Sequence, residues 1–541
     1  MLSVEGLRID ARSRNSPGVS PIVDDVSFSL KQGEVLGLIG ESGAGKSTIG
    51  LAAMGYTRQG CQVVGGSVRF DGVDLLTCPA SVRRQLRGRR IAYIAQSAAA
   101  SFDPVKRIID QICEAPVQHG VMDYEKARTT AIELLRELDL PHPDTFGEKF
   151  PHQASGGQLQ RAMAAMAMVC RPDVLILDEP TTALDVTTQI EVLSALRRVI
   201  RDHRTAAIYI THDLAVIAQV ATRIMVLRYG RTVEEATASE ILHRPQMEYT
   251  RALLSVSKSG NMRNAVYSDL PPLLELRSVT AGYAKQLKVV DDINLSIRKG
   301  ETVAVVGESG SGKSTLARVI TGLLPLDAGA MLFEGRELPR SLKRRSGDLR
   351  RRIQLIYQMP DVALNPKQRV HEILGRPLAF YHRLSGAKLA GRVNELLEHI
   401  NLDATYGSRF PSELSGGQKQ RICIARALAA APDIIICDEV TSALDPLVAN
   451  EILLLLDRLQ KAHGYAYMFI THDLGIVRRI AETVAVMQLG RIVALGPCEE
   501  IFNPPYHPYT EKLLASVPEL TTDWLDRYLL NRRDSASTSQ G

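Results

Sequence analysis

The chain has 541 residues, more than one hydrophobic core organises, and this length predicts about two to four domains. The composition, 45% hydrophobic and 23% charged, is that of an ordinary soluble globular protein. A net charge of +5 is small for this length and gives no argument for nucleic acid as a partner.

Cysteine usage and apolar patterning indicate the compartment. The chain has 7 cysteines, an odd count without a CxxC pair, as expected for reduced thiols in the cytosol. No run approaches the ~18 apolar residues of a membrane-spanning helix. The opening MLSVEGLRID lacks the basic-then-apolar pattern of a secretory signal. We therefore expect a cytosolic protein that reaches membranes only through partners.

In chain order, the first region alternates short apolar runs with helical patterns. The runs ending at Gly40, Asp178 and Ile210 have the length of buried strands. The stretches GKSTIGLAAMG, DYEKARTTAIELLRELDL and QIEVLSALRRVIRDH have helical patterns. Alternating strands and helices predict a parallel sheet covered on both faces. The segment between Gln96 and Ser155 lacks strand signals and predicts an inserted helical subdomain.

A repeat covers almost the whole chain. Four landmarks recur in the same order at an offset of about 260 residues. They are GESGAGKS and GESGSGKS, ASGGQLQR and LSGGQKQR, LDEPTTALD and CDEVTSALD, YITHDLAV and FITHDLGI. The repeat predicts a duplicated domain at residues 1–256 and 273–520, a linker at 257–272 and a tail at 521–541. The Ser-rich ending RRDSASTSQG is expected to be disordered.

The GESGAGKS stretch fits G-x-x-x-x-G-K-[ST] between a predicted strand and a predicted helix. Glycines let the backbone N–H groups turn toward a phosphate, and the following helix adds its positive end. Lys46 is expected at the β- and γ-phosphates and Ser47 at Mg²⁺, with Lys313 and Ser314 as counterparts. The candidate nucleotide-binding residues are Gly40, Ser42, Gly43, Gly45, Lys46, Ser47 and Thr48, and Gly307, Ser309, Gly310, Gly312, Lys313, Ser314 and Thr315.

Two adjacent carboxylates follow the strand at residues 174–178. Asp178 is expected to hold Mg²⁺ directly or through water, and Glu179 to polarise an attacking water. Asp438 and Glu439 repeat this pair. The alternative is a carboxylate that only caps a strand-to-helix turn.

Polar residues also follow the neighbouring strands. His212 and His472 stand in I-T-H-D stretches, where contact with a γ-phosphate is geometrically reasonable. Gln96 and Gln358 follow apolar runs, and a neutral amide binds Mg²⁺ or water loosely, as suits a sensor that disengages.

A second glycine-rich turn precedes another helix in each repeat. It consists of Ser155, Gly156, Gly157 and Gln158, and of Ser415, Gly416, Gly417 and Gln418. A helix N-terminus of this kind can bind an anion. The turn lies beyond the helical insertion, so it need not serve the same nucleotide.

The ordered set of phosphate loop, Gln loop, SGGQ turn, Asp–Glu pair and ITHD resembles the ATP-binding-cassette (ABC) ATPases. The resemblance implies an α/β fold with two tandem P-loop NTPase domains. Each would have a RecA-like parallel core, an inserted helical subdomain and an antiparallel β subdomain. In that family two cassettes close head to tail around two ATP molecules, each between one phosphate loop and the opposite SGGQ signature.

Further stretches are similar to importers of oligopeptides, dipeptides and nickel. They are ASFDPVKRI, ALNPKQRV, HRPQMEYTRALLSV and HPYTEKLLASVP. The resemblance implies ATP and Mg²⁺ as ligands, two membrane permeases as partners, an extracytoplasmic binding protein acting indirectly, and a peripheral location on the cytoplasmic face of the inner membrane. It leaves peptides, opines, glutathione and nickel open as solutes.

Three departures from the family pattern stand out. Ala154 replaces the usual leucine of the first signature, which predicts weaker packing at a working site. Tyr283 can stack on adenine, whereas residues 11–16 of the first repeat contain no aromatic residue. Many relatives carry a C-terminal cysteine cluster for iron–sulfur; no cysteine follows Cys498, so no such cluster is expected.

Two other classes remain as alternatives. A translation factor with tandem cassettes would carry a long charged helical linker, unlike SKSGNMRNAVYSDLPP. The ATPase of a monosaccharide or metal importer is the other. Monosaccharide ATPases usually have one degenerate site, whereas both Asp–Glu pairs and both ITH motifs survive here.

Overall fold

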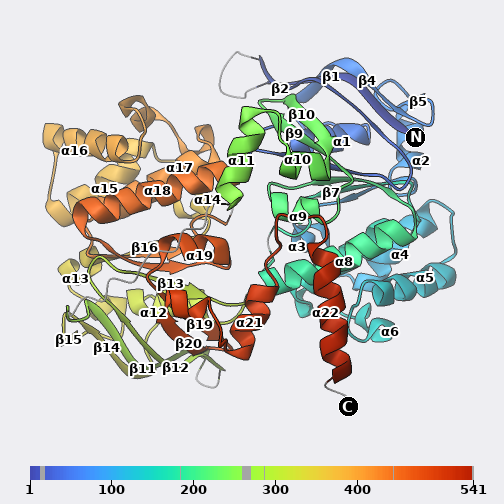
Figure 1. Ribbon diagram of the computed structural model, residues 1–541. Coiled ribbons are helices and arrows are strands. Elements are labelled where there is room, and N and C mark those ends of the chain that lie inside the picture. Colours follow the sequence, from blue (N-terminus) through green and yellow to red (C-terminus); the bar gives the residue numbers. More distant parts are fainter. Residues whose placement is uncertain (13–18, 183, 259–269, 285–286, 443, 539–541) are drawn as a thin grey trace. The chain divides into compact units, whose positions relative to one another are not determined.

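The structure is a computed structural model that describes residues 1–12, 19–182, 184–258, 270–284, 287–442 and 444–538. The chain divides into two compact units. The first comprises Met1–Lys258 together with Pro518–Gly541, and the second comprises Ser259–Val517. Most of the expected linker, residues 257–272, lies outside the described part. Figure 1 shows the elements in chain order.

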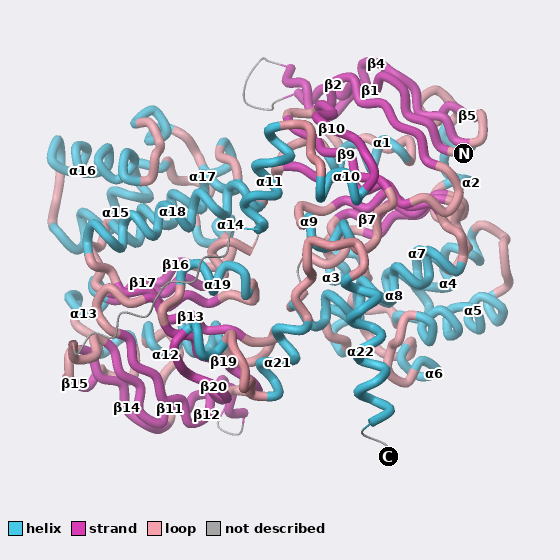
Figure 2. The backbone as a smooth tube through the Cα atoms, in the orientation of Figure 1, coloured by secondary structure: helices cyan, strands magenta, loops and turns pink. Residues whose placement is uncertain are grey.

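The first unit contains two sheets (Figure 2). An antiparallel sheet has the order β2-β1-β4-β5, and a six-stranded sheet has the order β10-β9-β3-β8-β7-β6, parallel except for β10. The strands are β1 (Leu2–Arg12), β2 (Val19–Leu30), β3 (Val35–Gly40), β4 (Cys61–Phe70), β5 (Val73–Asp74), β6 (Ile91–Ile94), β7 (Val174–Asp178), β8 (Ala206–Ile210), β9 (Arg223–Arg228) and β10 (Arg231–Thr237).

The helices of the first unit include every one that the sequence predicted. They are α1 (Lys46–Ala53), α2 (Ala80–Leu86), α3 (Ala98–Ser101), α4 (Ile108–Gln118), α5 (Tyr124–Glu137), α6 (Pro143–Phe146), α7 (Gly156–Met168), α8 (Val186–Asp202), α9 (Leu214–Ala218), α10 (Ala238–His243), α11 (Glu248–Lys258) and the chain's last helix α22 (Trp524–Thr538), with a 3₁₀ turn at Pro151–Gln153. Residues 97–154, all of them described, contain helices and no strand, which confirms the inserted helical subdomain.

The second unit repeats this arrangement with sheets β12-β11-β14-β15 and β16-β17-β18-β13-β19-β20. Its strands are β11 (Leu274–Ala284), β12 (Leu287–Ile297), β13 (Thr302–Val306), β14 (Ala328–Phe333), β15 (Arg336–Glu337), β16 (Ile353–Ile356), β17 (Ile434–Asp438), β18 (Ala466–Ile470), β19 (Thr483–Gln488) and β20 (Arg491–Pro497). Its helices are α12 (Lys313–Thr321), α13 (Gly347–Arg352), α14 (Pro360–Ala363), α15 (Val370–His382), α16 (Gly386–His399), α17 (Gly416–Leu428), α18 (Pro446–His463), α19 (Leu474–Ile480), α20 (Cys498–Ile501) and α21 (Pro508–Ala515). The duplicated α/β fold is therefore confirmed.

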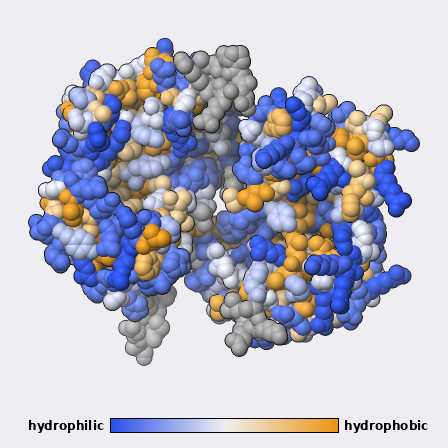
Figure 3. All heavy atoms as spheres, turned by 180° about the vertical axis from the view of Figure 1, so that it is seen from behind, coloured by the Kyte–Doolittle hydropathy of each residue, from blue (hydrophilic) through white to orange (hydrophobic). Residues whose placement is uncertain are grey.

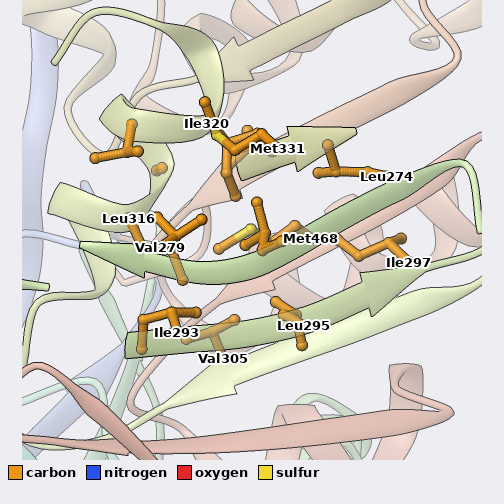
Figure 4. Close-up of a cluster of buried hydrophobic side chains, with 14 of the residues drawn as sticks. Leu274, Val279, Ile293, Leu295, Ile297, Val305, Leu316, Ile320, Met331 and Met468 are labelled. Carbon is orange, nitrogen blue, oxygen red and sulfur yellow. The ribbon is translucent and has the colours of Figure 1, made fainter. Parts of the chain in front are cut away.

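A hydrophobic core joins the two sheets of each unit around the helix that follows the phosphate loop. In the second unit, Leu316 and Ile320 of α12 are fully buried with Val279 of β11, Val305 of β13 and Met468 of β18. Figure 4 shows these side chains pointing toward one another. The first unit has the matching cluster, with Ile49 of α1 at 0% exposure. Because apolar burial is the main stabilising term, this core fixes the base of the phosphate loop.

The end of the chain differs from the expectation of disorder. Helix α22 continues to Thr538 and therefore includes most of RRDSASTSQG. Its first turn is anchored, because Trp524 is 6% exposed and Leu525 is 0% exposed. The Ser-rich composition concealed this anchor, which lies before the polar stretch.

Candidate ATP-binding and hydrolysis sites

Four strand ends meet in each unit. In the first unit β7 pairs in parallel with β8, with Asp178 opposite Ile210, and β3 pairs with β8, with Leu38 opposite Ile210. Strand β6 pairs with the other side of β7. The carboxyl ends of parallel strands lie at one edge, which is the usual ligand-binding position in such sheets. The polar residues predicted from the sequence follow these ends.

The phosphate loop begins where β3 ends. Gly40 has φ 151°, and a Cβ there would lie 2.0 Å from the carbonyl oxygen of Leu227, so no other residue fits. Gly45 has φ 90° and precedes α1 directly. Lys46 is 6% exposed, and its Nζ donates to the carbonyl oxygens of Gly40 (2.7 Å) and Glu41 (2.9 Å). The ammonium group therefore lies at the centre of the loop, where a phosphate would meet it.

A hydroxyl and a carboxylate lie together beside the loop. Ser47 Oγ donates to Asp178 Oδ1 at 2.8 Å, and Tyr93 of β6 donates to Asp178 Oδ2 at 2.7 Å. Asp178 is 4% exposed. Hard oxygen ligands of this kind, backed by phosphate oxygens, fit Mg²⁺. Ser47 and Asp178 are therefore suited to hold the cation of a bound Mg-nucleotide.

Glu179 occupies a strained position next to Asp178. Its φ of 49° is in the left-handed region, which costs a non-glycine residue about 1–3 kcal/mol and is common at active sites. Its backbone N–H donates to the carbonyl oxygen of Ile210 (2.9 Å). Gln96 Nε2 donates to Glu179 Oε2 at 3.0 Å, and His212 Nδ1 lies 3.3 Å from Glu179 Oε1. The three polar residues predicted from separate motifs thus form one cluster.

His212 and Glu179 each favour the charged form of the other. Burial favours the neutral imidazole, but the hydrogen bond and charge of Glu179 outweigh it and raise the pKa of His212. Burial also opposes ionisation of Glu179, but the hydrogen bond and charge of His212, together with the charge of Lys46, outweigh it and lower the pKa of that carboxyl. An ionised Glu179 can accept a proton or a hydrogen bond from water.

The second unit reproduces these contacts. Lys313 Nζ donates to the carbonyl oxygens of Gly307 and Glu308, both at 2.7 Å. Ser314 Oγ donates to Asp438 Oδ1 at 2.9 Å. In the same way Glu439 has φ 50°, accepts a hydrogen bond from Gln358 Nε2 and lies 3.5 Å from His472 Nδ1. Burial raises the pKa of Asp438, which favours a cation as its partner.

The SGGQ turns begin α7 and α17, and among the described contacts no hydrogen bond joins either turn to the cluster of its own unit. Ser155 accepts from Gln158 N (3.3 Å), and the Gln158 side chain accepts from Ser155 N (3.1 Å). This capping box sets the helix start. A Cβ at Gly157 would lie 2.1 Å from Thr188 Cγ2, so α8 requires glycine there. A Cβ at Gly156 would make only an ordinary contact, with Leu184 Cδ2 at 3.8 Å.

Two tyrosines contact the phosphate loops from the stretches HRPQMEYTRALLSV and HPYTEKLLASVP, called the C-terminal extensions of the two cassettes below. The motifs did not predict these contacts. Glu41 N donates to the hydroxyl of Tyr249 of α11 (3.2 Å), and Glu308 N donates to that of Tyr509 of α21 (2.9 Å). Both rings are buried, with 8% and 5% exposure. The available signal was the repeated Y-T pair in HRPQMEYTRALLSV and HPYTEKLLASVP.

Two of the departures from the family pattern, Ala154 and Tyr283, have different structural settings. Ala154 is half-buried, whereas its counterpart Leu414 is 6% exposed. Tyr283 is 54% exposed, and its hydroxyl accepts from Arg318 (2.8 Å), so the ring face stays open to a planar ligand. The matching stretch of the first unit lies mostly outside the described residues.

Two features are absent from the residues that the structure describes. Among them no group of three or more His, Cys, Asp or Glu side chains is placed to hold a metal ion. Within the same ranges, no helix combines the length and apolar character needed to cross a bilayer. The face in Figure 3 is largely hydrophilic, with smaller hydrophobic areas between.

Comparisons with known proteins identify the family. The ABC transporter family pattern matches residues 23–182 and 290–442. The C-terminal region of oligopeptide/dipeptide transporters matches residues 233–269 and 493–540. The chain is 38% identical to the glutathione import ATP-binding protein GsiA of Shigella boydii serotype 4, over 96% of this chain and 89% of that protein. The protein of the same name from Escherichia coli K12 gives the same values.

One similar solved structure is a cassette from another ABC transporter complex. The cbiO1 protein of Clostridium perfringens, part of the ABC transporter complex cbiONQ, is 30% identical, with a TM-score of 0.40, over 43% of this chain and 91% of that chain. The family matches and the two complete sets of site residues lead to one conclusion: this chain belongs to the ABC transporter family, as an ATPase with two cassettes that each carry the oligopeptide/dipeptide transporter C-terminal region.

Proposed function

We propose that the chain binds and hydrolyses Mg-ATP at two sites and thereby drives the uptake of peptides or peptide-like small solutes through two permease subunits. The observation that carries the proposal is the C-terminal extension, which reaches each phosphate loop through Tyr249 or Tyr509. An extension typical of peptide transporters is thus part of both ATP sites. The similarity to proteins named for glutathione import, a tripeptide, supports the same solute class.

Each site contains the groups that phosphoryl transfer needs. Lys46 would contact the β- and γ-phosphates, and bound Mg²⁺ would neutralise charge on them. Glu179, ionised and held by His212 and Gln96, would orient and polarise the attacking water. His212 would also sense the γ-phosphate. Lys313, Glu439, Gln358 and His472 would act likewise in the second cassette.

The signature residues complete this proposal. Ser155, Gly156 and their counterparts Ser415 and Gly416 present a capped helix start whose outer N–H groups suit an anion. We infer that ATP at each phosphate loop is completed by the signature of the opposite cassette. Loss of phosphate after hydrolysis would then remove the charge that holds the two cassettes closed.

The partners and the location follow from the importer proposal. Two integral-membrane permeases would bind the chain at the cytoplasmic face, and an extracytoplasmic binding protein would deliver the solute. No nucleic acid is involved. A monosaccharide importer fits less well, because both sites have the same contacts and neither has lost a reactive group.

The test is transport in cells that encode this chain and its neighbouring permeases. Deleting the gene should abolish energy-dependent uptake of labelled glutathione or of small peptides, and a plasmid copy should restore it. A Glu179→Gln, Glu439→Gln copy should not. The peptide assignment would be contradicted if the deletion strain still took up glutathione and small peptides but had lost uptake of nickel or of a monosaccharide.

A further inference from the structure

The last residues of the chain belong to the first unit, although they follow the second in sequence. Pro518–Gly541 group with Met1–Lys258, whereas Val517 ends the second unit. Figure 1 shows α22 beside α8 and α9, and the polar contacts described next connect the same elements. The chain therefore changes unit twice, once at Lys258–Ser259 and once at Val517–Pro518.

One buried side chain holds this returning segment. Gln219, the C-cap residue of α9, is 3% exposed. Its Nε2 donates to the carbonyl oxygens of Glu519 (3.1 Å) and Thr521 (2.7 Å), and its Oε1 accepts from Leu525 N (3.0 Å). An amide side chain offers donors and an acceptor together. It therefore binds both the turn before α22 and the first turn of that helix.

Apolar burial and an ion pair surround these hydrogen bonds. Leu525 is 0% exposed, and Trp524 is 6% exposed with its ring stacked on Tyr528 at 5.4 Å. At the rim, Arg197 of α8 donates to Asp526 at 2.7 Å. The apolar contacts supply most of the binding energy, since exposed ion pairs contribute little. The amide supplies the specificity, because leaving its buried partners unpaired would be costly.

The second cassette cannot offer the same surface. The aligned stretches THDLAVIAQV and THDLGIVRRI place Arg479 where the first cassette has Gln219. A guanidinium only donates, so it cannot accept from Leu525 N–H. Arg479 instead donates to Asn450 of the second unit. The docking surface for the returning segment therefore exists only on the first cassette.

We propose that Pro518–Thr538 is a strap that binds the first cassette specifically, with Gln219 as its recognition residue. The strap connects the end of the second cassette to α9, the short helix that begins just after His212. It keeps the two cassettes attached to each other when no nucleotide holds them together. This role is independent of which solute is transported.

The chain contains a built-in probe, since Trp524 is its only tryptophan. In the full-length protein, Gln219→Arg should raise acrylamide quenching of Trp524 roughly twofold or more, because a released strap exposes the ring. Leu525→Asp, which places a charge in the buried contact, should do the same from the strap side. The matched control is Arg479→Gln, which should leave quenching unchanged. Quenching at the wild-type level in both Gln219→Arg and Leu525→Asp would overturn the proposal.

A second experiment tests the attachment itself. A protease site is introduced within residues 259–269 of the full-length chain, which is then cleaved in nucleotide-free buffer with a tag on the first cassette. The strap should keep the second cassette bound in the wild type and in Arg479→Gln, whereas Gln219→Arg and Leu525→Asp should release it. Wild-type halves that separate, or Leu525→Asp halves that stay together, would overturn it.

Discussion

The two cassettes keep the same reactive groups but differ in what surrounds them. In each cassette a lysine donates to the phosphate-loop carbonyls, a serine donates to an aspartate, and a histidine lies beside a glutamate. Around them, Tyr93 bonds the aspartate of the first site, whereas Leu355 stands at the aligned position of the second. The second site also has Tyr283 near its helix α12. We expect the chemistry to be equivalent at the two sites and nucleotide or Mg²⁺ affinity to differ.

The largest effect should come from the glutamates. Glu179→Gln and Glu439→Gln each keep the side-chain shape but remove the base, which contributes about 10²–10⁴-fold at its own site. ATP should still bind. Each single variant should therefore lose roughly half or more of the steady-state turnover, and the double variant about 10²-fold or more, measured as phosphate release with the permeases present.

A matched pair of controls sharpens this comparison. Glu41→Gln and Glu308→Gln change a carboxylate of each phosphate loop that pairs with Arg228 or with Lys512, and they should have far smaller effects. If one of the two catalytic variants left turnover at the wild-type rate, the two sites would not be chemically equivalent.

The residues that the sequence singled out could be found because each lies within a short contiguous motif, and their catalytic roles stay predictions. Glycines that need a left-handed φ, as at Gly45, and apolar runs that end in carboxylates, as at Asp178, carry their structural reason locally. Parallel pairing then brings these motifs together, so the cluster follows once the strand order is known.

What the sequence did not predict depends on long-range packing. Tyr249 reaches Glu41 across 208 residues, and Gln219 contacts Leu525 across 306 residues. The repeated Y-T pair marks the tyrosines but does not identify their partners, and Gln219 has no such signal. In each contact the partner is a backbone group, which every sequence contains. Helix α22 was missed for the same reason, since its anchoring partner lies in the other half of the chain.

The second largest effect is expected for the phosphate-loop lysines. Lys46→Ala removes the ammonium group that donates to the carbonyl oxygens of Gly40 and Glu41, and Lys313→Ala does the same in the second unit. These oxygens would then face the phosphates without a positive charge between them. Turnover in permease-containing preparations should fall severalfold for each. Lys→Arg variants serve as controls that keep the charge. Wild-type turnover in either alanine variant would mean that its site does not contribute to hydrolysis.

A smaller effect is expected on the Mg²⁺ dependence of turnover, which should differ between the site with Asp178 and the site with Asp438. Tyr93→Phe removes a hydrogen bond to Asp178, worth about 1 kcal/mol, and should change the Mg²⁺ concentration for half-maximal turnover severalfold. The reciprocal Leu355→Tyr should make the second site resemble the first. Titration of Mg²⁺ in backgrounds with one active site measures each separately. An unchanged Mg²⁺ dependence in Tyr93→Phe would show that this hydroxyl does not distinguish the sites.

The smallest effect concerns the tyrosines of the C-terminal extensions. Tyr249→Phe and Tyr509→Phe leave a phosphate-loop N–H without its described acceptor, at a cost of about 1 kcal/mol, or up to roughly fivefold in ATP affinity. Because Glu308 N lies 2.9 Å from its tyrosine and Glu41 N lies 3.2 Å, the second site should be affected more. Equilibrium binding of ATP in the Glu→Gln double background avoids turnover during the measurement.

Tyr506→Phe is the matched control for this prediction. Its hydroxyl donates to the carbonyl oxygen of Phe502 within the same extension and does not contact the loop. If Tyr506→Phe weakened ATP binding as much as Tyr509→Phe, the extension would act only through its overall stability. If only Tyr509→Phe did so, the hydroxyl would position the loop directly, and a change in the extension could reach the phosphates through a single hydrogen bond.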